Sequence, residues 1–192
     1  MSNIVKKISI KLAVAAGLVA LASPAAFCQA LDSSPAQVSL TATLSEALTI
    51  SATPGAVSFN LVSGGTATSS APVAITTTWV LSSARSTVAL TGWFSNAAQA
   101  LSSGGATPVY IPTSEVLGKV GSGTYTAFTQ SPTGSAPGAA GASLVMFTQA
   151  INSANVSSNR TDNLNLEINL ASQTQLPAGT YNGTLNLEAE AL

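Results

Sequence analysis

Hydrophobic and polar residues alternate along the last stretch of the chain. After the turn signal Pro177-Ala178-Gly179, one set of alternate positions is apolar or small and the other set is polar. The first set is Tyr181, Gly183, Leu185, Leu187, Ala189 and Ala191, and the second is Asn182, Thr184, Asn186, Glu188 and Glu190. A period of two predicts a β-strand with one face on a core and one face in water.

The same period recurs through most of the chain, and turn signals such as Thr53-Pro54-Gly55 separate the runs. Outside the N-terminal region no window keeps a helical period, apart from one expected helical turn at 97–101. Many short strands with frequent turns predict a β-sandwich or a barrel. We favour an all-β, immunoglobulin-like Greek-key β-sandwich, which a donor strand from a neighbour would complete. The predicted strands are 38–44, 48–52, 57–61, 73–81, 88–94, 144–151, 164–170 and 181–191, with shorter pieces between 109 and 128.

The segment from Leu176 to Tyr181 resembles the corner before a late strand of such sandwiches. In that corner a tyrosine hydroxyl bonds back to the backbone a few residues upstream. The alternative is that Tyr181 is simply a core aromatic residue.

The N-terminal region has the three parts of a secretory signal peptide. Lys6, Lys7 and Lys11 precede an apolar run at 12–27, and Cys28-Gln29-Ala30 offers small residues at a cleavage site. An uncleaved membrane anchor would need ~20 apolar residues, and this run is shorter and contains Pro24. Lipidation at Cys28 is disfavoured by the bulky Phe27. We therefore expect residues 1–30 to be a signal peptide and residues 31–192 to be one β-sandwich domain, with a flexible loop at 131–142.

Composition narrows the function of the expected mature chain. It has no histidine and no cysteine, because the one cysteine lies in the signal peptide. It has three basic and seven acidic residues, a net charge of −4. Three scattered basic residues cannot replace the counterions of a nucleic acid, so we expect no nucleic-acid partner and no membrane binding after signal cleavage. No nucleophile or acid–base set stands out, so we expect no catalytic residue, no cofactor and no enzymatic activity.

One cluster of polar residues and the two tryptophans are candidates for binding sites. Asp162, Asn163, Asn165 and Glu167 have a hint of calcium-ligand spacing, but they lack the glycine of a calcium-binding loop, and a strand would place the last three on one solvated face. We therefore predict no metal site. Trp79 shares its parity with Val73 and Ile75 and is expected in the core, whereas Trp93 has the opposite parity to Phe94 and is the better candidate for an exposed, sugar-stacking aromatic.

Both ends of the mature chain resemble one family. The order Gln37–Leu44, Leu48–Pro54 and Val57–Phe59, together with Leu164–Leu170 and Leu176–Tyr181, is similar to spore coat protein U-like domains and the related archaic chaperone–usher pilins. The resemblance implies an incomplete immunoglobulin-like fold whose groove accepts a strand from a neighbouring subunit. Those domains usually carry cysteines near the Leu48 segment, and this chain has none.

By this resemblance the alternating Val38, Leu40, Ala42 and Leu44 are the partner-binding residues of the donated strand. A weaker similarity, at Trp79-Val80-Leu81, is to WxL cell-wall-binding domains, whose second motif would need a tryptophan where Leu187 stands.

These observations lead to an expected function. The chain is expected to be a bacterial, non-enzymatic structural subunit of a surface fibre or coat, exported to the periplasm or cell surface and assembling by β-strand addition. Its expected partners are copies of itself or neighbouring subunits, with a periplasmic chaperone as a further candidate. The alternative is a monomeric cell-envelope or carbohydrate-binding β-sandwich.

Overall fold

The computed structural model describes residues 33–192, so the expected signal peptide lies outside the described residues. The chain divides into two units, residues 1–41 and residues 42–192. In the first unit, the described residues 33–41 form no helix or strand. The folded architecture is that of the second unit. Within the described part of the chain, no helix is long and apolar enough to span a membrane.

The second unit is built almost entirely from antiparallel strands. A single turn of 3-10 helix, η1, covers Thr113–Glu115. The strands are β1 (Ala47–Thr53), β2 (Thr66–Thr68), β3 (Val73–Val80), β4 (Thr87–Trp93), β5 (Leu101–Ser102), β6 (Tyr110–Ile111), β7 (Val116–Val120), β8 (Thr126–Ala127), β9 (Ser143–Ala150), β10 (Ser157–Asn169) and β11 (Asn186–Ala191).

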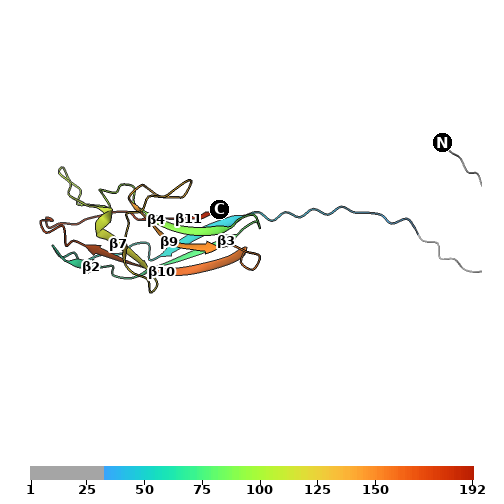
Figure 1. The fold of residues 1–192 in the computed structure, drawn as a ribbon, viewed down its shortest axis with the longest axis horizontal. Helices are drawn as coiled ribbons and strands as arrows, with labels where there is room; N and C mark the ends of the chain where they lie inside the picture. The colour runs from blue at the N-terminus through green and yellow to red at the C-terminus, as the bar shows by residue number, and fades with distance from the viewer. Residues whose placement is uncertain (1–32) are drawn as a thin grey trace, which may run out of the picture. The chain divides into compact units, whose positions relative to one another are not determined.

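Two sheets pack against each other (Figure 1). The larger has the order β1-β3-β10-β7-β8, with β2 pairing to one end of β10. The smaller has the order β11-β4-β9, and β5 and β6 form a separate ribbon. This arrangement confirms the predicted all-β sandwich.

The core between the sheets follows the predicted parity. In β10, Leu164, Leu166 and Ile168 are buried, whereas Asn165 and Glu167 between them are only half-buried. From the facing sheet, Val88 and Leu90 of β4 are fully buried. Trp79 is 2% exposed, as predicted for a core residue, and its ring Nε1 donates to the carbonyl of Asn155 at 2.8 Å.

Several predicted boundaries were wrong. The run 57–61 forms no regular strand and keeps a single bridge, from Phe59 to Ser69. The predicted helical turn at 97–101 is instead a hydrogen-bonded turn, in which the Gln99 N–H donates to the Asn96 carbonyl at 3.1 Å, followed by β5. Strand β10 begins seven residues before the predicted Leu164, because its polar first half still pairs along β3. Residues 131–142 contain no strand, as predicted for a loop, and the Gly141 N–H donates to Ser131 Oγ at 2.9 Å across its base.

Matched substitutions on β10 test the parity of the sandwich. Leu166→Asp places an unpaired charge between the sheets and should lower the free energy of unfolding by about 3–5 kcal/mol. Asn165→Asp, one residue away on the opposite face, should change it by less than about 0.5 kcal/mol. Urea unfolding followed by circular dichroism measures both. Equal losses in the two variants would contradict the assigned faces.

Candidate functional site: an open edge and an apolar groove

One edge of the sandwich is closed by the chain itself. After β8, Gln130 forms a two-bond bridge with Ser143 of β9, with N···O distances of 2.8 and 3.1 Å. The Gln130 side chain also accepts from the N–H of Val145 at 2.8 Å. Phe128, just before this crossing, is fully buried and packs edge-to-face on Phe94 at 5.2 Å between ring centroids. The larger sheet is therefore joined to the smaller one along this side.

The opposite edge is open. Strand β1 ends the larger sheet, and β11 ends the smaller one. The two strands approach each other, but no hydrogen-bonded ladder joins them within residues 33–192. Their apolar side chains, such as Leu48, Ile50 and Leu187, pack on the core and remain only half-buried. This open edge is the side on which the apolar side chains around the core are only half-buried.

An apolar groove follows the open edge beyond the end of β1. Its volume is about 860 Å³. One wall is residues 54–61 and the other is residues 179–185. The floor holds Val73, Val116, Leu164, Leu166 and Ile168 from the larger sheet and Phe94 and Leu187 from the smaller one. The groove therefore reaches into the core between both sheets.

The lining of the groove carries no charged side chain. Its polar lining residues are serine, threonine, asparagine and tyrosine. An apolar floor with uncharged polar walls suits an extended segment that has one apolar and one uncharged polar face. It does not suit an ionic ligand, because nothing in the lining would compensate a charge removed from water.

Strand β11, which follows the 179–185 wall in the chain, has unused backbone hydrogen-bonding capacity on one side. Leu192 exchanges hydrogen bonds with Thr87 on the β4 side, and Asn182 exchanges them with Ser102 of β5. In an antiparallel ladder successive residues point their N–H and C=O groups to opposite sides. In β11, Leu187 and Ala189 therefore turn these groups away from β4 and toward the open edge. An edge of this kind is a template for another strand.

Two local features hold this wall in place. The Tyr181 hydroxyl donates to the carbonyl of Pro177 at 2.8 Å, which confirms the tyrosine corner predicted from the sequence. At Gly183 a Cβ atom would lie 2.0 Å from the carbonyl oxygen of Ala100. Only glycine allows β5 to approach this closely, and that contact supports the wall from outside the groove.

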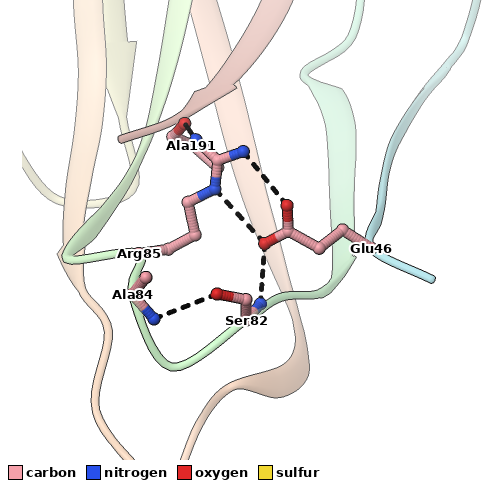
Figure 2. A network of polar contacts seen from close by, with 5 residues as sticks. All are labelled: Glu46, Ser82, Ala84, Arg85 and Ala191. Atoms are coloured by element: carbon pink, nitrogen blue, oxygen red, sulfur yellow. Dashed lines mark hydrogen bonds and ion pairs between the residues drawn. The ribbon is translucent and has the colours of Figure 1, made fainter. Parts of the chain in front are cut away.

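The other end of the open edge is closed by a polar network (Figure 2). The Glu46 carboxylate accepts from the backbone N–H of Ser82 at 2.7 Å and from the Arg85 guanidinium at 3.0 and 3.2 Å. Arg85 Nη1 also donates to the carbonyl of Ala191 in β11 at 3.1 Å. We call these contacts the Glu46 clasp. The clasp joins the residue just before β1, the turn between β3 and β4, and the last strand.

The clasp changes the ionisation of Glu46. Its hydrogen bonds with Arg85, and next that with Ser82, hold the pKa of the Glu46 carboxyl below its ordinary value of 4.5. Both groups of the ion pair are partly exposed, with side-chain exposures of 43% for Arg85 and 38% for Glu46. Solvent screening therefore keeps the contribution of the pair modest.

The four residues predicted to bind a partner lie before β1. Val38 and Leu40, in the first unit, are 80% and 90% exposed. Ala42 and Leu44, at the start of the second unit, are also exposed, with Leu44 at 85%. None of the four belongs to a strand, although 38–44 alternates as a strand would.

Sequence reasoning missed the clasp and the residues that line the groove, although the family resemblance implied that a groove exists. The groove residues are distant in sequence, and only the pairing of the strands shows which edge they leave open. One signal was available for the clasp, since Arg85 is one of three basic residues after residue 30 and Glu46 immediately precedes a predicted strand.

The other candidate sites do not form. Asp162 is 9% exposed and its carboxylate pairs with Arg160, at 2.6 and 2.8 Å, rather than facing a metal. Within residues 33–192, no cluster of three acidic, histidine or cysteine residues is placed to hold a metal ion. Trp93, predicted to be the better candidate for an exposed, sugar-stacking aromatic, is half-buried, and its indole nitrogen is buried without a partner among the described residues.

Comparisons with protein-family models, with curated proteins and with solved structures gave no match.

A tyrosine substitution tests the support of the groove wall. Tyr181→Phe removes the bond to Pro177 and should lower the free energy of unfolding by about 0.5–1 kcal/mol. The matched control is Tyr110→Phe, because the Tyr110 hydroxyl makes no hydrogen bond to another described residue. Chemical denaturation of both variants gives the comparison. A Tyr181→Phe protein as stable as Tyr110→Phe would rule out a stabilising role for the corner.

The clasp predicts a pH dependence with a definite sign. Because the folded-state pKa of Glu46 is lowered, its stabilising effect is complete above the ordinary carboxyl pKa and is lost as pH falls through the lowered value. The difference in denaturation midpoint between wild type and Glu46→Gln should therefore be constant near neutral pH and disappear in acid. A difference that grows as pH falls would contradict the clasp.

Proposed function

We propose that this chain is an exported, non-enzymatic structural subunit of a surface fibre or coat, assembling by β-strand addition. The observation that carries the proposal is the open edge, where an uncharged apolar groove extends between two walls. We infer that its occupant is residues 37–44 of a second copy. On this view the domain is an immunoglobulin-like sandwich that is complete only in the assembly.

Residues 37–44 match the groove lining in their chemistry. Residues 37–44 contain no charge and alternate Val38, Leu40, Ala42 and Leu44 with polar residues. The groove lining also contains no charge and presents apolar side chains at its floor. Fully extended, these eight residues span about 26 Å. The segment would bury its apolar face in the groove and pair its backbone with the free edge of β11.

The short connection between residues 37–44 and β1 favours a second copy, rather than the same chain, as the source of the strand in the groove. Only Ser45 and Glu46 separate the segment from β1. If the segment turned back as a two-residue hairpin, Leu44 would pair with Ala47 and Gln37 with Pro54. The chain's own segment would thus lie beside β1 and would reach only the start of the 54–61 wall. A segment from another copy has no such restriction.

The alternative function is a monomeric cell-envelope or carbohydrate-binding sandwich. Sugar binding commonly uses an exposed aromatic face, and the buried positions of Trp79 and of the Trp93 indole nitrogen disfavour it. A periplasmic chaperone remains a proposed partner, since an unfilled groove would need cover before assembly.

Peptide binding tests strand addition directly. A protein lacking residues 31–44 should be monomeric and should bind a peptide of residues 37–44. Leu40→Asp in the peptide should weaken binding roughly 10- to 100-fold, since a buried leucine contributes about 1.5–3 kcal/mol. Thr41→Asp, the matched control, places the same charge on the polar face and should have a much smaller effect.

The measurement is fluorescence anisotropy with labelled peptides. Equal weakening by the two peptide substitutions would reject a strand seated with the predicted face inward. If the chain from residue 31 instead stays monomeric at high concentration, with 37–44 protected from hydrogen exchange, the segment pairs within its own chain. The monomeric alternative would then stand.

A further inference from the structure

The Glu46 clasp lies where the chain's own segment would have to turn. Residues 37–44 join the fold through Ser45, and Glu46 is the first residue after it. A hairpin back along β1 would place its turn at Ser45-Glu46. Two-residue hairpin turns need positive φ angles and favour glycine, asparagine or aspartate, so Ser-Glu is a poor turn sequence. The Glu46 side chain is in addition held by Ser82 and Arg85.

The clasp also occupies the space that such a hairpin would need. At this end β1 and β11 border only a shallow hollow of about 320 Å³, less than half the groove volume. Glu46, Leu48, Arg85 and Ala189 are among its lining residues. A strand returning beside β1 would have to enter between β1 and β11 and displace the Arg85 side chain from both of its partners.

Arg85 further removes one backbone acceptor from the open edge. The Ala191 carbonyl points away from β4, because Leu192 makes the bonds on the β4 side. Arg85 Nη1 donates to this carbonyl at 3.1 Å. An incoming strand therefore meets the outward-facing backbone groups of Leu187 and Ala189, and beyond them a carbonyl that is already bonded to a positively charged group. A charge at the edge of a sheet is a known means of ending strand pairing.

We propose that the Glu46 clasp prevents the chain's own N-terminal segment from pairing beside β1, and so directs that segment to a second copy. This inference rests on the proposed strand addition. It assigns Arg85 and Glu46 a positioning role: neither side chain lines the groove, and both set which copy fills it.

The test uses the chain from residue 31 onward with one change on each side of the clasp, Glu46→Gln and Arg85→Met. The control is Lys119→Met, which removes a basic residue that contacts Tyr125 instead. Light scattering after size-exclusion chromatography gives the monomer fraction at matched concentrations. Hydrogen exchange of the monomer peak reports whether 37–44 is paired. Thermal melts show whether each variant is folded.

Both clasp variants should raise the monomer fraction about two- to fivefold over the control, the range expected for a partly exposed ion pair. In those monomers residues 37–44 should be protected from exchange, which a simple loss of stability would not produce. Arg85→Lys, which keeps the charge, should restore part of the assembly. A monomer fraction equal to the control in both folded variants, or a rise with 37–44 unprotected, would overturn the clasp's role.

The wild-type result separates the two proposals. If wild type assembles and the variants behave as the control does, the clasp proposal fails and strand addition stands. If wild type is monomeric at every concentration with 37–44 unprotected, strand addition itself fails. If wild type is monomeric with 37–44 protected, the segment already pairs within its own chain and both proposals fail.

Discussion

The structure depends on whether the backbone N–H and C=O groups at each sheet edge are paired, and on whether the apolar side chains beside that edge are covered. Buried N–H and C=O groups must be paired, and half-buried apolar side chains gain stability when water is removed from them. On one side the chain meets both needs through the Gln130–Ser143 bridge and the buried Phe128. On the other side no ladder joins β1 to β11 within residues 33–192, and apolar side chains such as Leu48 and Leu187 stay half-buried. The two sheets are thus joined along one edge and not along the other.

The two ends of the open edge also differ in charge. Exposed strand edges in soluble proteins are commonly protected by lysine or by inward-pointing charges. Here the groove lining and the 37–44 segment have none, whereas the clasp contains Glu46 and Arg85 and the neighbouring strand β11 carries Glu188 and Glu190.

The sequence predicted the fold class and the parity of the main strands, because period-two alternation reports directly which side chains face a core. It also predicted the corner at Tyr181, since a hydroxyl four residues from Pro177 is a local feature. It could not predict which residues form the groove, because β1 and β11 become neighbours only through the pairing of β3, β10 and β4. The run 57–61 alternates like a strand but pairs only at Phe59, because residues 66–70 take up most of the bonding on that side of the larger sheet.

The segment 37–44 shows why alternation alone does not decide whether a strand forms. Its pattern is as regular as that of β10, yet it pairs with nothing in residues 33–192. A strand gains its stability from neighbours on both sides and from a covered face, and an isolated extended segment has neither. The alternation therefore indicates only that the segment has one apolar and one polar face, and so which kind of surface it could contact. The groove shares the segment's lack of charge and its apolar side chains, and it is the surface that we propose the segment of a second copy would meet.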